Sequence, residues 1–140
     1  MSDDTALRSL RERIKRHEGF RPRPYRDTGG HMTIGYGHRI RSGEKLECVT
    51  QEEADKIFEA DLQEVMDKLN LPEQLSPVRK GVLIEMGFNL GITGLRKFKK
   101  MWAAISVEDF DTAADEMLDS KWSRQVKGRA NTLANLMRSG

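Results

Sequence analysis

Two spacings of apolar residues divide the chain. Before residue 19 and after residue 50, apolar side chains recur every three or four positions, which predicts amphipathic helices. Between residues 24 and 40 the spacing changes to two, and a Gly-Gly pair at 29–30 separates two short runs, which predicts a β-hairpin. One helix, a hairpin and then helices alone indicate an α+β fold.

Capping signals mark where these helices begin and end. Gly19 ends the first helix, because glycine adopts the left-handed conformation that closes helices. Thr50 and Glu53 form a capping box that opens a long helix, and Ser76 before a proline opens another. That helix is apolar on nearly every side from residue 81 to 90, so we expect it to be central and buried. Shorter helices are expected across 93–105, across 106–119 with a capping box at Ser106, across 121–126, and from residue 127 onward.

The segment after the Gly-Gly pair is interpreted as one strand. Alternation places Met32, Ile34, Tyr36, His38 and Ile40 on one face, and Thr33, Gly35 and Gly37 on the other. The two glycines remove side chains from the second face, so a bulky ligand could approach the backbone there.

A small β unit cannot bury its own apolar face, so it must pack on helices. We expect a single domain over residues 1–140. A small N-terminal lobe with the β-hairpin, approximately residues 15–60, would pack across a cleft from a larger all-helical lobe, approximately 1–14 plus 61–140. A chain of this length buries roughly two thirds of its unfolded surface, enough for a real core.

Composition narrows the classes of function. The formal net charge is +2, and the 24 basic and 22 acidic residues are intermixed, so no dense basic stripe points to nucleic acid. The single cysteine, Cys48, excludes an internal disulfide. No apolar run approaches 18 residues, so we expect no stable membrane insertion. The acidic first five residues do not resemble a signal peptide, so we expect synthesis in a bacterial cytoplasm.

Two carboxylates flank the first strand of the hairpin. Glu18 lies in the last turn of a helix, where carbonyl groups and the macrodipole should raise its pKa. Asp27 lies in a polar turn and can stay ionised, and Thr33 offers a hydroxyl that could hold a water. One protonated and one ionised carboxyl suit hydrolysis of a glycosidic bond. The simpler interpretation is a solvated helix-end charge and a turn-forming aspartate.

The same stretch resembles the phage-type (T-even phage lysozyme-like) lysozymes, glycoside hydrolase family 24. The resemblance depends on the glutamate at 18, Tyr-Arg-Asp-Thr at 25–28, and Thr-Ile-Gly-Tyr-Gly-His at 33–38. It continues through 50–61, 86–94, Phe98, 120–122 and 129–130.

The resemblance implies a peptidoglycan-hydrolysing lysozyme, a muramidase or endolysin that cleaves the β-1,4 bond between N-acetylmuramic acid and N-acetylglucosamine with inversion. Glu18 would be the general acid and Asp27 the partner carboxylate, and Thr33 would position the attacking water. Inversion would separate the two carboxyls by roughly 6.5–9.5 Å. Bacterial cell-wall peptidoglycan is the implied partner, and no cofactor is implied.

The resemblance also implies residues that bind substrate and residues that support the site. The substrate-binding positions would be Arg39, Phe88, Met101 and Glu116. His38 would pair with Asp61, which lies inside an apolar helix stripe and needs a buried partner. Arg129 would lie near Glu18 and oppose the rise in its pKa, so the sequence leaves the net shift open.

Some alternatives stay open at this point. A zinc site built from His17, His31 and His38 lacks metal-ligand spacing, so we expect no metal. Glu85 lies in the buried helix without an assigned role, and facing the groove is one option.

The competing functions are a lytic transglycosylase, which forms an anhydro sugar, and a non-catalytic wall-binding module. Asp27 and Thr33 weigh against the first, and retention of both acids weighs against the second. We expect a monomer that reaches periplasmic peptidoglycan through a pore made by another protein.

Overall fold

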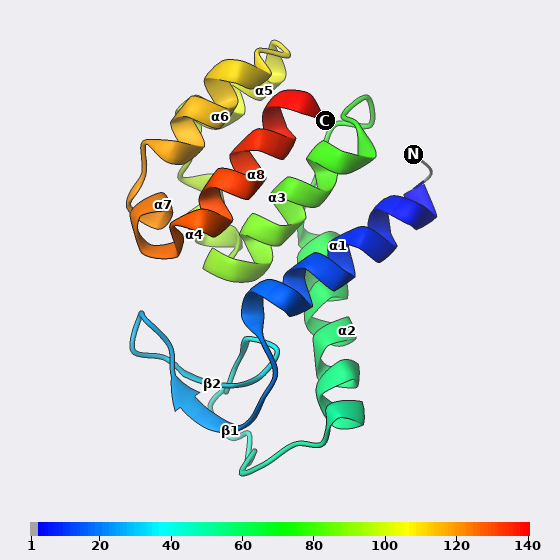
Figure 1. Ribbon diagram of the computed structural model, residues 1–140, viewed down its shortest axis with the longest axis vertical. Coiled ribbons are helices and arrows are strands. Elements are labelled where there is room, and N and C mark those ends of the chain that lie inside the picture. Colours follow the sequence, from blue (N-terminus) through cyan, green and yellow to red (C-terminus); the bar gives the residue numbers. More distant parts are fainter. Residues whose placement is uncertain (1–2) are drawn as a thin grey trace.

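The computed structural model describes residues 3–140, which form eight helices and one three-stranded antiparallel sheet (Figure 1). The helices are α1 Asp3–Glu18, α2 Gln51–Lys68, α3 Pro77–Leu90, α4 Ile92–Arg96, α5 Lys99–Ser106, α6 Phe110–Leu118, α7 Lys121–Val126 and α8 Gly128–Ser139. The strands are β1 Arg21–Arg26, β2 Met32–Gly35 and β3 His38–Arg39, in the order β1-β2-β3. The α+β prediction is confirmed.

The predicted hairpin is present, but the strand after it is shorter than expected. Strands β1 and β2 pair antiparallel, with Tyr25 opposite Thr33. Gly35 (φ +66) and Gly37 (φ +72) then turn the chain back, and β3 pairs with β2. The single strand over 32–40 is therefore wrong, and Thr33 and Gly37 do not share a strand face. The turn needs glycine at both positions, because residues with a side chain rarely adopt a backbone conformation with positive φ.

Most helix boundaries follow the predicted caps. Thr50 and Glu53 form the capping box of α2, and the Ser76 hydroxyl accepts the N–H of Arg79 at the start of α3. The expected capping box at Ser106 is wrong. Ser106 ends α5, and the Asp109 side chain caps α6 instead, because its carboxylate is placed to accept the N–H of the third helical residue.

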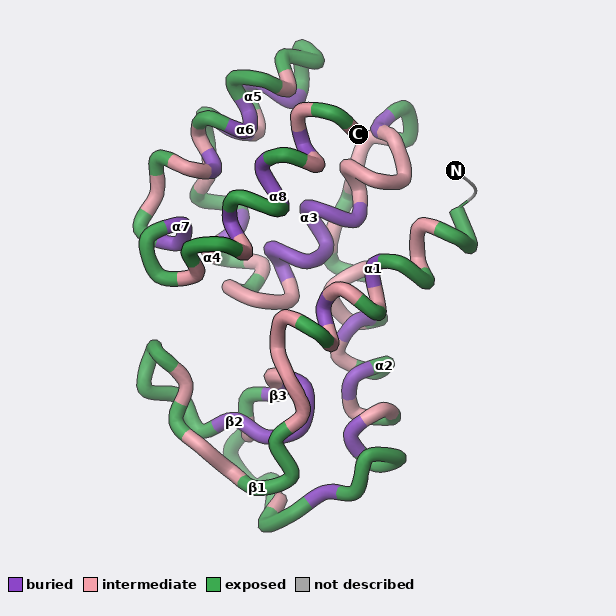
Figure 2. Tube along the Cα trace, viewed as in Figure 1, coloured by how far each residue is buried: buried purple, intermediate pink, exposed green. Residues whose placement is uncertain are grey.

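The apolar residues form two buried clusters, one on each side of α3. The first cluster joins α1, the sheet and α2, and includes Leu10, Ile14, Ile34, Phe58 and Leu62. The second lies among α3 and α5–α8, and includes Leu83, Met86, Met117, Leu133 and Met137. Every residue of α3 from 81 to 87 is buried, as predicted for a central helix (Figure 2).

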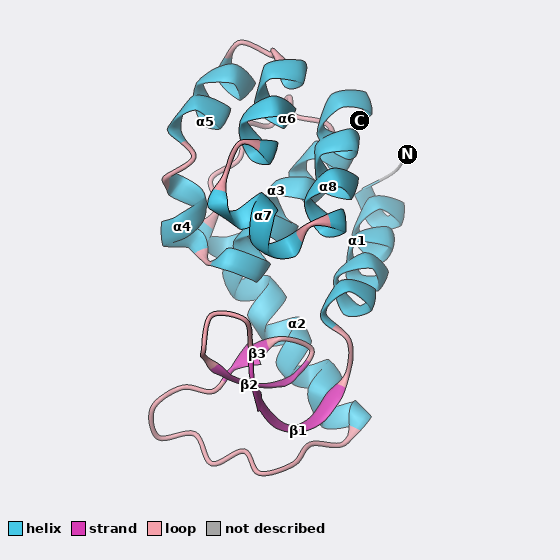
Figure 3. Cartoon of the chain, turned by 60° about the vertical axis from the view of Figure 1, so that its left-hand side comes forward, coloured by secondary structure: helices cyan, strands magenta, loops and turns pink. Residues whose placement is uncertain are grey.

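The sheet lies at one end of the molecule and α3–α8 gather at the other, with α2 running between them (Figure 3). Helix α1 packs along α3 and ends where β1 begins, so Glu18 lies at the junction of the two parts. Within residues 3–140, none of the helices combines the length and apolar character required to cross a bilayer.

Candidate active site

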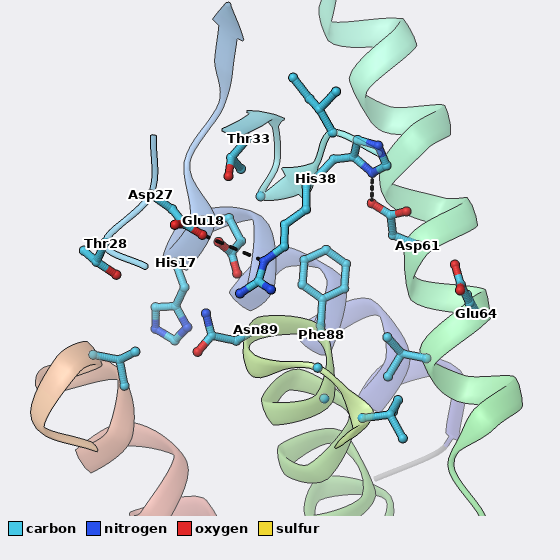
Figure 4. A pocket seen from close by; sticks show the side chains of 18 of the residues that line it. His17, Glu18, Asp27, Thr28, Thr33, His38, Asp61, Glu64, Phe88 and Asn89 are labelled. Carbon is cyan, nitrogen blue, oxygen red and sulfur yellow. Dashed lines mark hydrogen bonds and ion pairs between the residues drawn. The ribbon is translucent and has the colours of Figure 1, made fainter. Parts of the chain in front are cut away.

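A cleft of about 840 Å³ lies between the sheet and the helices. Residues from α1, all three strands, α2, α3, α4, α7 and α8 line it. Eight of the ten predicted site residues are among them: Glu18, Asp27, Thr33, His38, Arg39, Asp61, Phe88 and Arg129. Figure 4 shows Phe88 and Asn89 on α3 and Asp61 on α2, with Glu18, Asp27 and Thr33 at the α1 and sheet side. Phe88 also packs on Phe58, with ring centroids 5.3 Å apart.

Two predicted substrate-binding residues do not reach the cleft. Met101 has no exposed surface and lies in the helical core, so the prediction that it contacts sugar is wrong. Glu116 lies on α6, which packs against α5 and α8 away from the cleft lining. Both positions depend on how α5 and α6 pack against each other, which no local sequence pattern shows.

Glu18 is the last residue of α1 and forms an ion pair with Arg129, whose Nη1 lies 2.9 Å from Oε2. Burial raises the pKa of Glu18, and this effect outweighs the charge and hydrogen bond of Arg129, which lower it. The negative charge of Glu85 raises this pKa further, whereas His17 lowers it. Desolvation therefore decides the direction that the sequence left open, and the pKa of Glu18 lies above its ordinary value.

The pKa of Asp27 is shifted in the opposite direction from that of Glu18. Burial raises the pKa of Asp27, but the backbone N–H groups of His31 and Gly29 and the charges of Arg39 and His31 together lower it below its usual value. Both N–H groups donate to Oδ1, at 2.8 and 2.9 Å. The other oxygen, Oδ2, lies 3.9 Å from Nε of Arg39. The turn thus holds Oδ1 in place, and Oδ2 remains available to accept a hydrogen bond or a proton.

Thr33 is buried, with 2% of its surface exposed, yet it lines the cleft. Its hydroxyl donates a hydrogen bond of 2.9 Å to the carbonyl of His31. Because the only hydroxyl hydrogen is used there, the oxygen presents lone pairs to anything in the cleft. Thr33 can therefore accept a hydrogen bond from a water and orient it.

His38 lies between two carboxylates. Its Nδ1 is 2.8 Å from Oδ2 of Asp61, which confirms the predicted pair, and its Nε2 is 3.0 Å from Oε1 of Glu44. The hydrogen bond to Asp61 raises the pKa of His38, and the bond to Glu44 adds to this against the opposing effect of burial. The pair joins β3 to α2, whereas Glu44 anchors the loop after β3. Glu44 was not predicted, since it gives no signal within a polar loop.

Glu85 does not face the cleft, so that option is excluded. Its side chain has no exposed surface and is paired with three cations or donors: Arg13, His17 and Arg129. His31 lies 3.5 Å from Asp27, so the three histidines have separate carboxylate neighbours. Within residues 3–140, no group of three or more histidine, cysteine and acidic side chains is placed to hold a metal.

The structure adds cleft residues that were not predicted. The Arg21 guanidinium lies over the Tyr25 ring, 4.2 Å from its centroid, and both line the cleft. Asn89 accepts a hydrogen bond of 2.7 Å from Nε1 of Trp122. Tyr25 and Asn89 lie inside the sequence runs that carry the resemblance, so a signal for these two residues was present.

Comparison with known proteins identifies sequences that are similar to this chain. The sequence model of the family described as phage lysozyme matches residues 15–138. The chain is 30% identical to the pre-baseplate central spike protein Gp5 of Enterobacteria phage T4, over 99% of this chain and 29% of that protein. It is 26% identical to the probable T4-type lysozyme 1 of Dictyostelium discoideum, over 94% of this chain and 95% of that one. An endolysin of Bacillus phage B103 is 29% identical, over 79% of this chain and 43% of the relative.

These matches and the fold define a class. The chain belongs to the phage lysozyme family, which makes it by class a glycoside hydrolase that acts on peptidoglycan. The chain spans under a third of the spike protein's length but nearly all of the Dictyostelium relative's. We therefore do not infer from the spike protein that this chain assembles into a larger particle.

Proposed function

We propose that this chain is an inverting muramidase, which hydrolyses the β-1,4 bond between N-acetylmuramic acid and N-acetylglucosamine with Glu18 as acid and Asp27 as base. One observation carries the proposal. Two carboxyl groups line the same cleft, and their surroundings move their pKa values in opposite directions, up for Glu18 and down for Asp27. Such a pair supplies a proton donor and a proton acceptor at one pH.

Glu18 performs the acid step. Its raised pKa keeps a proton available for the leaving glycosidic oxygen, and donation of that proton assists cleavage of the C–O bond. Arg129, at 2.9 Å, then stabilises the carboxylate that the transfer leaves behind.

Asp27 and Thr33 act on the water. Oδ2 of Asp27 can accept a proton from the attacking water, since Oδ1 is occupied by two backbone N–H groups. The Thr33 oxygen accepts the second hydrogen of that water, because its own hydrogen is bound to His31. A water attacking from the face opposite the leaving group inverts the anomeric centre. The separation of 6.5–9.5 Å between the carboxyls stays a prediction.

Arg39 and Phe88 are the proposed sugar contacts that remain. Phe88 offers an apolar ring surface at the cleft, and Arg39 offers a guanidinium beside Asp27. We also propose that the enzyme acts as a monomer on periplasmic peptidoglycan after release through a pore. The endolysin relative supports this route for a chain with no spanning helix among its described residues.

The test is clearance of purified peptidoglycan by Glu18→Gln, with Glu116→Gln as the matched control outside the cleft. We expect the first variant to lose about 10²–10⁴-fold in rate and the second to keep its activity. Full activity of Glu18→Gln would overturn the proposal. Wall binding with no clearance by the unmodified chain would favour a binding module instead.

Two product measurements separate the chemistries. Proton NMR of the first product should show the inverted anomer, and retention would exclude the mechanism. Mass spectrometry of the muropeptides should show hydrated reducing ends. Anhydro sugars would instead identify a lytic transglycosylase, which needs no activated water.

A further inference from the structure

Glu85 is a buried carboxylate that the mechanism above does not use. Its side chain has no exposed surface. Oε1 lies 2.6 Å from Nε of Arg13, and Oε2 lies 2.6 Å from Nδ1 of His17 and 2.9 Å from Nε of Arg129. An ionised carboxylate only accepts hydrogen bonds, so His17 carries its hydrogen on Nδ1. Arg13 and His17 come from α1, and Arg129 from α8, so Glu85 joins three helices at the inner end of the cleft.

Arg129 divides its guanidinium between two carboxylates. Its Nε faces Glu85 and its Nη1 faces Glu18, each at 2.9 Å. Its Nη2 is buried and has no hydrogen-bond partner in the described structure. A guanidinium free of Glu85 could offer two parallel N–H groups to Glu18, which is the strongest arrangement for holding a carboxylate ionised. Glu85 occupies the Nε edge, and Arg129 contacts Glu18 through a single ion pair.

We propose that Glu85 is a positioning residue for the reaction: it holds Arg129 by its Nε edge and balances the positive charge beside Glu18. The acid thereby holds its proton more firmly while its counter-cation stays in place. This role depends on the proposed function of Glu18 as general acid. Glu85 itself lies behind Arg129 and does not line the cleft.

The charged groups around Glu18 support the direction of this effect. Arg129 from α8 and His17 from α1 lower the pKa of Glu18, and Glu85 from α3 raises it, in addition to the larger effect of burial. On the strand side, burial raises the pKa of Tyr25 and the Glu18 charge raises it further, so the phenol adds no charge near the acid. Removal of the Glu85 charge would leave the cations without their balance, and Glu18 would ionise more readily.

The test is the pH profile of kcat/KM for Glu85→Gln, which keeps the shape of the side chain and removes its charge. The basic limb of the profile should move to lower pH, and kcat/KM above the limb should fall roughly tenfold or more, as expected for one charge at close range in a partly buried site. KM should not change, because Glu85 does not touch substrate. A ¹³C NMR titration of the Glu18 carboxyl should move in the same direction.

Arg13→Gln is the matched control. It removes another partner of Glu85 but leaves the contact between Arg129 and Glu18, so it should lower the melting temperature without moving the limb. If Glu85→Gln does not fold, the double variant Glu85→Gln/Arg13→Gln removes the anion together with one cation and should show the same shift. An unchanged profile and an unchanged Glu18 titration in the folded variant would overturn the positioning role.

The two proposals fail in different ways. If Glu18→Gln keeps full activity, the acid role fails whatever Glu85 does. If Glu18→Gln is inactive and removal of the Glu85 charge leaves the profile in place, only the positioning role fails.

Discussion

Gly37 lies directly against Glu18. A Cβ atom built on Gly37 would lie 2.6 Å from Oε1 and 2.7 Å from the carboxyl carbon of Glu18. Real side chains do not approach so closely, and the contact involves the carboxyl that is buried against Arg129. The turn between β2 and β3 therefore leaves room for the acid by having a glycine at this position, and this is a second requirement besides its positive φ.

Gly37→Ala should therefore damage both stability and catalysis. The left-handed conformation alone costs about 1–2 kcal/mol for alanine, and the overlap must also displace the Glu18 carboxyl. Misplacement of a catalytic group by about 1 Å can cost on the order of 100-fold in rate. Thermal unfolding and peptidoglycan clearance would measure the two effects.

Gly30→Ala is the control for this prediction. Gly30 has a similar backbone conformation, at φ +81, but a Cβ there meets nothing within 4 Å. Gly30→Ala should lose stability through the same backbone strain, and the rate per folded molecule should stay unchanged. Equal rates for the two variants would contradict a steric role of Gly37 beside the acid.

The contact between Arg39 and Asp27 predicts a small effect on the acid limb of activity. The guanidinium helps to lower the pKa of Asp27, although burial and two backbone N–H groups have larger effects. Arg39→Gln should raise that pKa, so the acid limb should move to higher pH. Because the Arg39 side chain is half exposed and 3.9 Å away, the change should be only about twofold in rate below the limb.

Salt and a second arginine provide the checks. The difference between Arg39→Gln and the parent should shrink at high ionic strength, since exposed charges are screened. Arg41→Gln breaks a pair with Glu64 and not with Asp27, so its acid limb should not move. A shift of the same size in both variants would show a general loss of positive charge.

The local motif was sufficient to predict three residues that line the cleft. Glu18, Asp27 and Thr33 lie within 16 positions of one another in sequence, at a helix end, in a turn and in the strand after it, and their proposed roles come from the resemblance to the phage-type lysozymes. The pair of His38 and Asp61 was implied by the same resemblance, and the position of Asp61 inside an apolar helix stripe indicated that it needs a partner.

Long-range packing limited the rest of the prediction. Glu85 pairs with residues 72, 68 and 44 positions away, and no local pattern shows that α1, α3 and α8 converge there. The same reason explains the error at Met101, whose burial depends on how α5 packs within the helical core. The sign of the Glu18 pKa shift also required the structure, because burial and Arg129 act in opposite directions.

Met101→Ala tests the correction at that position. Truncation of a fully buried methionine should cost about 2–5 kcal/mol through lost contacts and a residual cavity. The rate of the folded enzyme and its KM should stay unchanged, because the side chain does not reach the cleft. Chemical denaturation and clearance kinetics measure these separately. A raised KM at temperatures where the variant is fully folded would restore Met101 as a substrate contact.

The group of His38, Asp61 and Glu44 predicts how stability depends on pH. The folded-state pKa of His38 is raised by its hydrogen bonds to Asp61 and Glu44, against the effect of burial. Its stabilisation is therefore fully present below the unfolded histidine pKa near 6.5 and is lost as pH rises through the folded value. The backbone N–H of Arg41, together with His38, lowers the pKa of Glu44 against the effect of burial, so that contribution is lost as pH falls through the folded Glu44 value.

His38→Asn should remove the alkaline decline and lower the free energy of unfolding by about 2 kcal/mol near pH 6, the range for a hydrogen bond to a charged group. Urea unfolding at pH values from 4 to 9 would measure both effects. His31→Asn is the matched control, because His31 is half exposed and lies 3.5 Å from its carboxylate. That variant should keep the alkaline decline of the parent. A His38→Asn profile that still declines at alkaline pH would assign the decline to another group.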